Sequence, residues 1–177
     1  MGSARLPGAD DESHRLVELA TRLGHSIAGH RCVLVTGATT GFPHIISRAA
    51  RERGGFSIGI SPALSKDEHL SQYLLPVDGV DVLIYTGFGL KGRNVINVRS
   101  SDIVIIFGGE LGTLNEFTIA YDEGKVIGVL EGTGGVADRI LEISKLSSRR
   151  GPGEIIFERE PEILITNCLN ALQEQGR

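Results

Sequence analysis

The sequence predicts an α/β fold of three layers, in which helices cover both faces of a mainly parallel sheet of five to seven strands. Short apolar runs rich in β-branched residues alternate with amphipathic stretches of ten or more residues, which is the pattern of strands joined by helices. The apolar runs lack polar alternation, as expected for strands buried on both faces. Glycine-rich turns follow several of these runs and mark the points where strands end.

Helical periodicity and its interruptions set the boundaries of the elements. Leu16, Leu19 and Leu23 recur at helical spacing, and Gly29 stops that helix. The segment 62–79 shows no period, so we expect a long connection over the carboxyl edge of the sheet. In order, the expected elements are a loop over 1–11, a helix over 13–29, a strand over 32–36, a glycine turn over 37–41, a helix over 43–53, strands over 56–61 and 80–85, a helix over 91–101, a strand over 103–107, a helix after it, a strand over 126–130, a helix over 136–146, a break over 147–153, an edge strand over 155–157 and a helix over 161–173.

Length and composition bound the class of protein. The 177 residues, of which 41% are hydrophobic and 23% charged, are enough for a single domain over 1–177 with a sizeable core. A formal net charge of −4, without a long Lys/Arg run, argues against a nucleic-acid polymer or a membrane surface as partner and favours a small ligand. No apolar stretch reaches the roughly 20 residues that span a bilayer, and the N-terminus lacks a signal-peptide core, so a cytoplasmic location is expected. Cys32 and Cys168 are predicted to be reduced thiols.

The stretch from Ile103 to Phe117 carries the strongest local signal. A buried strand over 103–107 is broken by Gly108, and the helix that follows is expected to have Thr113 as its N-cap, with Glu116 three residues later as in a capping box. On that register Glu116 lies in the first turn, about 130° from the apolar stripe of the helix. Ligands bind at the carboxyl ends of parallel strands, and free N–H groups at a helix N-terminus suit phosphate. The sequence therefore predicts a carboxylate beside a phosphate-binding loop.

These residues resemble the Lonely Guy family. The series Gly109-x-x-Gly112-Thr113-x-x-Glu116, with Arg93 upstream, is similar to the family motif PGGxGTxxE and its preceding arginine. Members are cytokinin-type nucleoside 5′-monophosphate phosphoribohydrolases with a Rossmann-like fold, long mislabelled lysine decarboxylases. The likeness covers most of the chain and looks closest to a branch that includes the molybdenum-cofactor carrier proteins.

The resemblance implies a role for each matched residue. Glu116 would be catalytic, engaging the ribose and stabilising a developing oxocarbenium ion or orienting water, and Arg93 would hold the negative charge of the substrate. Cleavage of an N-glycosidic bond builds positive charge on the sugar, which a carboxylate stabilises. Neither a cofactor nor a metal is expected, because His44 and His69 have no second ligand at a suitable spacing. The residues expected to bind phosphate or nucleotide are Gly37, Thr39, Thr40, Gly41, Asn94, Gly108, Gly109, Glu110, Gly112 and Thr113.

Two functions follow from this pattern. The first is hydrolysis of a nucleoside 5′-monophosphate, AMP or cytokinin-type, to free base and ribose 5-phosphate, which Glu116 and Arg93 favour. The second is a non-catalytic carrier or sensor of a nucleotide or a pterin-like molybdenum cofactor. Gly108 and Glu110 replace the proline and second glycine of the motif, and a Glu110 carboxylate in the loop would repel phosphate unless it points away or binds a cation. Glu110 therefore favours the carrier. A phosphate-bearing small molecule is the expected partner in both cases.

Two expectations concern the whole molecule. We expect a homodimer or a higher homo-oligomer, with the apolar helix face from Phe117 to Ala120 as the contact. Family members open with a strand ahead of the segment that matches 2–5, whereas this sequence starts at Met1. Either a preceding segment is missing, or the sheet lacks one central strand that something else must replace. The Gly132–Gly135 turn is interpreted as structural.

Overall fold

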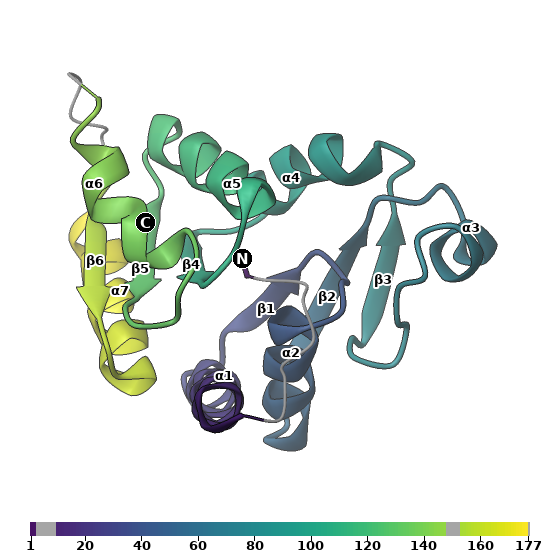
Figure 1. Cartoon of the computed structure of the whole chain (residues 1–177), viewed down its shortest axis with the longest axis horizontal. Coiled ribbons are helices and arrows are strands. Elements are labelled where there is room, and N and C mark those ends of the chain that lie inside the picture. Colours follow the sequence, from purple (N-terminus) through teal and green to yellow (C-terminus); the bar gives the residue numbers. More distant parts are fainter. Residues whose placement is uncertain (3–9, 148–152, 177) are drawn as a thin grey trace.

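The computed structural model describes residues 1–2, 10–147 and 153–176 and places six strands in two three-stranded parallel sheets (Figure 1). The strand orders are β1-β2-β3 and β4-β5-β6. The elements are α1 (Asp11–Gly29), β1 (Val33–Thr36), α2 (Phe42–Glu52), β2 (Phe56–Ser61), α3 (Lys66–Ser71), β3 (Val82–Tyr85), α4 (Gly89–Arg99), β4 (Ile103–Phe107), α5 (Leu111–Asp122), β5 (Val126–Leu130), the 3₁₀-helix η1 (Ala137–Arg139), α6 (Ile140–Ser144), β6 (Ile155–Glu158) and α7 (Pro161–Glu174).

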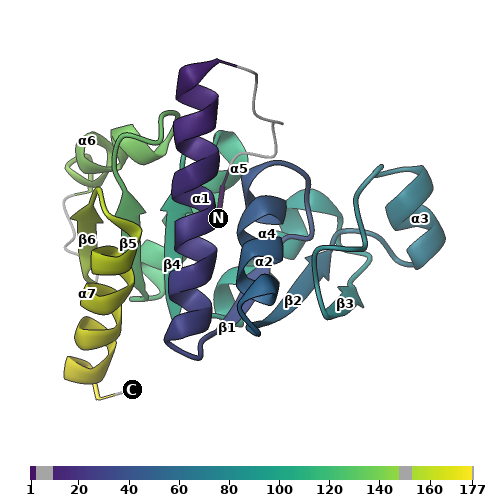
Figure 2. The same cartoon turned by 90° about the horizontal axis from the view of Figure 1, so that it is seen from below.

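Helices form a layer on each side of the strands. Helices α1, α2 and α7 lie on one side, and α4, α5 and α6 lie on the other (Figures 1 and 2). This arrangement confirms the predicted three-layer α/β fold. The single continuous sheet that we expected is split instead, because no hydrogen bonds join β1 to β4. Gly2 forms a parallel bridge with Phe107, so the amino-terminal residues reach only the carboxyl end of β4.

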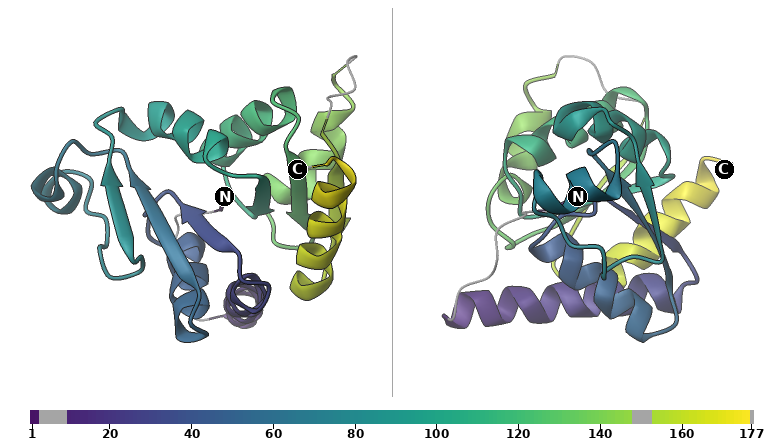
Figure 3. Two further views of the ribbon diagram at one scale, coloured as in Figure 1. Left: turned by 180° about the vertical axis from the view of Figure 1, so that it is seen from behind. Right: turned by 90° about the vertical axis from the view of Figure 1, so that its right-hand side faces the viewer.

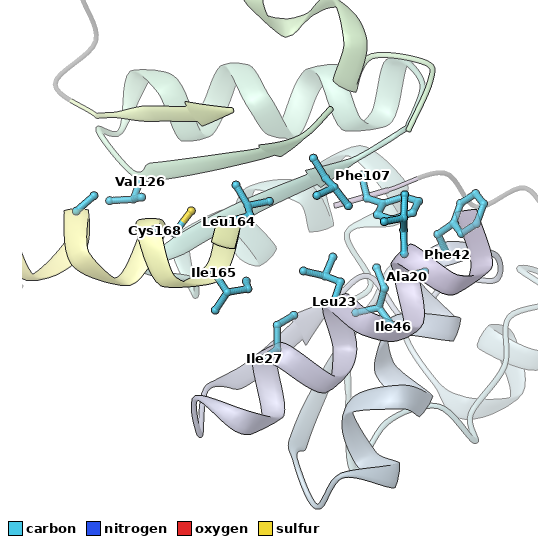
Figure 4. Packing of buried hydrophobic residues seen from close by; sticks show 13 residues of the cluster. Ala20, Leu23, Ile27, Phe42, Ile46, Phe107, Val126, Leu164, Ile165 and Cys168 are labelled. Carbon is cyan, nitrogen blue, oxygen red and sulfur yellow. The ribbon is translucent and has the colours of Figure 1, made fainter. Parts of the chain in front are cut away.

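The buried apolar residues form two clusters, one for each helical layer. The first joins α1, α2 and α7 to β4 and β5, with Leu23 and Phe107 among its largest fully buried side chains (Figure 4). The second joins α4, α5, η1 and α6 to the opposite side of the same strands and includes Phe117 and Ala120. We expected this helix face to contact a second copy of the chain. That prediction is wrong, because Phe117 and Ala120 are buried within the chain itself.

The connection over 62–79 is more ordered than its sequence suggested. It contains α3, which Ser65 caps by accepting a hydrogen bond from Glu68 N–H at 3.2 Å. Fully buried His69 fixes the helix, because its Nδ1 lies 2.8 Å from Ser61 Oγ and its Nε2 lies 3.0 Å from the Pro76 carbonyl oxygen. A helix of this length lacks the turns needed for a visible period, so the pattern gave no sign of it.

The remaining boundaries agree with the expectation within a few residues. The helix expected over 136–146 consists of η1 followed by α6, and most of the break expected over 147–153 lies outside the described residues. Cys32 and Cys168 are both free thiols. Within the described ranges, every helix is too short or too polar to cross a bilayer.

Candidate functional site

A cavity of about 870 Å³ lies between the two sheets and is lined by residues of β1 and β4. Its middle is apolar, whereas the end at the carboxyl termini of these strands is polar. That end collects residues from the loop after β1, from α4 and from the start of α5. The polar residues and glycines that line it include Gly37, Thr39, Lys91, Arg93, Asn94, Glu110, Gly112, Thr113 and Glu116.

Arg93 reaches from α4 across the polar end of the cavity. Its side chain is buried, with 6% of the residue exposed, and its guanidinium lies against the Cα of Gly37, where a Cβ would collide with it. Arg93 Nη1 is 3.9 Å from Glu116 Oε1, and Arg93 Nε has no hydrogen-bond partner among the residues that the structure describes. Burial lowers the pKa of Arg93, although the Glu116 carboxylate opposes this. A buried guanidinium with unused donors is suited to bind an anion.

Glu116 lies on α5 and is held by side chains of α4. Asn97 Nδ2 donates to Glu116 Oε1 at 3.4 Å. With its amide turned to satisfy both of its polar atoms, Asn94 donates to the same oxygen at 3.3 Å. Glu116 is 6% exposed. The sequence placed this residue away from the apolar stripe of the helix, which did not predict its burial. It is buried because α4 packs on that side of α5. The carboxylate is therefore fixed in position and faces the cavity.

The first turn of α5 supplies N–H groups to the same place. The helix begins at Leu111 and Glu110 is its N-cap, so the prediction of Thr113 as N-cap is wrong. Gly108 and Gly109 both adopt positive φ, which turns the chain early and brings Thr113 into the first turn. The N–H groups of Leu111, Gly112 and Thr113 have no acceptor four residues earlier in the helix. Lys91 Nζ adds a positive charge nearby, 3.4 Å from the Leu111 carbonyl oxygen.

The glycines just after β4 have a structural role. Gly108 N–H donates to Thr133 Oγ1 at 2.9 Å, and the carbonyl oxygens of Gly108 and Gly109 accept hydrogen bonds from Ala137 and Val136. Thr133 is buried, and a Cβ at Gly135 would collide with the Gly109 carbonyl oxygen. The Gly132–Gly135 turn thus supports the loop from behind, in agreement with its structural interpretation.

The structure brings most of the predicted site residues together, but not all of them. Thr40, Gly41, Gly108 and Gly109 do not line the cavity, and Gly41 instead precedes α2. Gly37, Thr39, Asn94, Glu110, Gly112 and Thr113 line it with Arg93 and Glu116. Glu110 lies at the exposed rim. Among the described residues no group of three or more His, Cys, Asp or Glu side chains is arranged to hold a metal ion.

The sequence interpretation missed Asn97 and Lys91. Asn97 is fully buried and its Nδ2 donates to Glu116, whereas its Oδ1 has no partner within the described part of the chain. It follows Arg93 by four residues, and residues at this spacing share one face of a helix. That spacing was available in the sequence. Lys91, two residues before Arg93, carried no such signal, because its proximity to α5 depends on how the two helices pack.

Comparisons with known proteins agree on one group of relatives. Residues 1–165 match the model of the SLOG cluster4 family. A cytokinin riboside 5′-monophosphate phosphoribohydrolase of Mycobacterium marinum is 28% identical over 169 residues, which cover 89% of this chain and 84% of that protein. The molybdenum cofactor binding protein of the phototrophic bacterium Rippkaea orientalis has a TM-score of 0.73 and 30% identity, over 100% of this chain and 94% of the other. The molybdenum cofactor carrier protein of Chlamydomonas reinhardtii has a TM-score of 0.73 and 26% identity, over 98% and 96%.

Proposed function

Because the chain belongs to the SLOG cluster4 family, we propose that the polar end of its cavity binds a nucleoside 5′-monophosphate and that Glu116 promotes hydrolysis of the N-glycosidic bond. The observation that carries this proposal is the buried pair of Arg93 and Glu116, 3.9 Å apart, beside the free N–H groups of α5. A cationic subsite for phosphate and a fixed carboxylate are the two elements that this reaction needs. The products are the free base and ribose 5-phosphate.

The chemistry assigns a different task to each group. Arg93 and the first turn of α5 hold the 5′-phosphate by charge and by N–H donors. As the bond from C1′ to the base nitrogen breaks, its electron pair leaves with the base, which is protonated, and positive charge develops on the ribose. The Glu116 carboxylate stabilises that charge, and a water molecule adds its hydroxyl group to C1′ while its remaining proton balances the one taken up by the base. Asn94 and Asn97 position the carboxylate through their hydrogen bonds.

Incubation of the purified protein with a panel of nucleoside 5′-monophosphates, AMP included, tests the proposal by chromatography of the released base. We expect release by the wild type and a loss of at least about 100-fold in Glu116→Gln, which keeps the size and hydrogen bonds of the side chain but removes its charge. Glu18→Gln, an exposed carboxylate on α1, is the matched control. Equal base release by wild type and Glu116→Gln would exclude Glu116 from the chemistry.

The second candidate function is a carrier of a phosphate-bearing cofactor. It is favoured by Glu110, which lies at the exposed rim of the cavity at the start of α5, and by the two solved relatives described as molybdenum cofactor proteins. A carrier would be stabilised against heat by its ligand and would release no base from any nucleotide of the panel. The same incubation, followed by thermal-shift measurements, separates the two functions.

We also propose that two copies of the chain associate through the apolar face of β1, β2 and β3. Strand alternation and register place Val33, Phe56, Val82 and Ile84 on one face, and each is more than 40% exposed. Exposed apolar surface of this kind on a soluble protein indicates an interaction site. A second copy could cover it with the same face across a two-fold axis.

A further inference from the structure

Lys91 lies in the first turn of α4, where helix electrostatics disfavour a positive charge. Neither α4 nor α5 has an acidic residue in its first turn. The N-terminus of a helix carries a partial positive charge, so negative side chains are favoured there and lysine is disfavoured. Lys91 is also exposed, so its side chain contributes little to the core. A residue that breaks a local rule without a gain in packing is a candidate for function.

The Lys91 side chain reaches from α4 to the start of the neighbouring helix. Helices α4 and α5 adjoin each other on one side of the strands (Figures 1 and 3). Lys91 Nζ donates to the Leu111 carbonyl oxygen at 3.4 Å and lies 4.0 Å from the place that a Cβ would take on Gly112. The first-turn N–H groups of α5 have no acceptor within the helix, and the side chain of its N-cap, Glu110, does not cap them. The ammonium group therefore lies beside N–H groups that add positive potential of their own.

The charge of Lys91 is not balanced in the way that the charge of Arg93 is. Arg93 Nη1 lies 3.9 Å from the Glu116 carboxylate, and both side chains are buried. Opposite charges this close offset most of each other's field at a distance. The hydrogen bond of Lys91 goes to a carbonyl oxygen, and within the described ranges no carboxylate forms an ion pair with it. Lys91 therefore supplies positive charge at the polar end of the cavity that Glu116 leaves uncompensated.

A bound phosphate would meet the two cations on different sides. Arg93 and Glu116 line the polar end of the cavity as buried residues, whereas Lys91 lines it from the exposed side. A phosphate whose ester oxygen leads to a sugar beside Glu116 turns its free oxygens towards Lys91 and the first turn of α5. A terminal phosphate has three free oxygens and a charge of about −1.5 to −2 at pH 7. A phosphodiester has two free oxygens and a single charge, and it needs room for a second ester group.

We propose that Lys91 selects a terminal phosphate, a phosphomonoester, over a phosphodiester at this site. The proposal rests on the phosphate subsite of the proposed function and adds the residue that distinguishes the charge of the ligand. One negative charge faces Arg93, and the second is balanced by Lys91 together with the N–H groups of α5. Nucleoside monophosphates and other phosphomonoesters belong to the accepted class, whereas cyclic nucleotides and dinucleoside monophosphates, whose phosphate is a diester, do not. The selection applies to an enzyme and to a carrier alike.

Calorimetric binding of AMP and of its phosphate methyl ester tests this selection. The two ligands share the base and the sugar and differ in phosphate charge and one methyl group. In Glu116→Gln, in which we expect no turnover, AMP should bind at least about 10-fold more tightly than the ester. Addition of Lys91→Met, which removes the charge and keeps a long side chain, should reduce this preference to less than about threefold. Addition of Lys91→Arg should retain it.

Lys145→Met is the matched control, because Lys145 is an exposed residue at the end of α6 and does not line the cavity. It should leave the preference for AMP unchanged. The same preference in Glu116→Gln with and without Lys91→Met would overturn the proposal. A loss of preference in Lys91→Arg would also overturn it, because the positive charge would then not be the selecting feature.

This result is separable from that of the base-release assay. Ribose 5-phosphate carries a terminal phosphate and has no N-glycosidic bond to cleave, so its binding is measured in the wild type and in Lys91→Met. If no nucleotide of the panel releases base while Lys91→Met weakens ribose 5-phosphate binding at least about 10-fold, hydrolysis is wrong and selection by Lys91 stands. If neither AMP nor ribose 5-phosphate binds, the phosphate subsite and the role of Lys91 in it are both wrong.

Discussion

Gly37 leaves room for the guanidinium of Arg93, which reaches from α4 to the loop after β1. A methyl group at this position would meet the end of a flexible side chain, so Gly37→Ala should displace Arg93 while the fold remains intact. We expect nucleotide affinity to fall at least about tenfold, because a charge-assisted hydrogen bond is weakened. Gly29→Ala is the matched control, since a Cβ there has no neighbour within 4 Å. Calorimetric titration with a nucleotide measures the affinity of both variants. Equal affinities would show that Arg93 does not contribute to nucleotide binding.

Cys168 offers a probe of the core at the scale of one residue. Its side chain lies on the buried face of α7, and burial raises its thiol pKa to about 12. Cys32 is partly exposed. Because thiolate is the reactive form, a disulfide reagent at pH 8 should modify Cys32 in the native protein and Cys168 only after unfolding. Reaction of both thiols at one rate without denaturant would contradict the packing of α7.

The raised pKa of Cys168 also makes the stability of the fold depend on pH. The stabilisation from the neutral buried thiol is fully present below pH 9.0, the ordinary pKa of a thiol, and is lost as the pH rises towards 12.

At the scale of elements, the contact between α1 and α2 depends on Gly24. A Cβ there would collide with the Ile46 carbonyl oxygen and lie 2.8 Å from the Ala49 Cβ. Alanine normally stabilises a helix interior by roughly 1 kcal/mol relative to glycine. We nevertheless expect Gly24→Ala to lower the free energy of unfolding by about 1–3 kcal/mol, because the two helices must separate. Gly29→Ala in the same helix should not destabilise. Urea denaturation of the pair tests this, and a stabilised Gly24→Ala would show that α1 and α2 are less closely packed.

The start of β3 is joined to α2 and β2 by Asp81. Its carboxylate accepts hydrogen bonds from Ser57 N–H at 2.8 Å and from Arg51 Nε at 2.9 Å. Partial burial alone would raise its pKa, but the bonds from Ser57 and Arg51 together hold the pKa below the ordinary value of 3.8. Because the pKa is lower in the folded state than in the unfolded state, the ionised Asp81 stabilises the fold at pH values above 3.8. This stabilisation is lost as the pH falls from 3.8 through the pKa of the folded state. Asp81→Asn should therefore be less stable than wild type at pH 7, with a gap that narrows below pH 3.8. A gap independent of pH in thermal unfolding would contradict the ionic role.

The elements that the sequence predicted well are those with a strong local pattern. The run of Ile103–Phe107 is fully apolar, so its strand was expected with the observed bounds. The start of α5 was misplaced because the turn at Gly108 and Gly109 ends earlier than the capping pattern around Thr113 suggested. Burial of Glu116 depends on how α4 packs against α5, and no local pattern records that contact. The residues that were matched to the motif nevertheless lie together in the structure, since Arg93, Glu116 and the start of α5 line one cavity.

At the scale of the whole molecule, the apolar face of β1, β2 and β3 accounts for the proposed self-association. The chain has a mass of 18.9 kDa, and light scattering should give about twice that value if two copies pair. Val82→Lys with Ile84→Lys places charges on the exposed part of β3 and should yield a folded monomer, since both side chains are partly in solvent already. Leu146→Lys, also exposed, controls for the added charge. If the wild-type protein has the mass of a monomer at micromolar concentration, the proposed interface between two copies is wrong.

The most direct test of the site compares a nucleotide with the nucleoside that lacks its phosphate. Calorimetric binding of AMP and adenosine is measured in Glu116→Gln, in which we expect no turnover of the nucleotide, with and without Arg93→Gln. If Arg93 and the first turn of α5 bind the phosphate as proposed, AMP should bind at least about 10-fold more tightly than adenosine, and the preference should largely disappear when Arg93 is replaced. Both proposed functions include a phosphate subsite at this end of the cavity. An AMP preference that survives Arg93→Gln unchanged would contradict the assignment of the polar end of the cavity as the phosphate site.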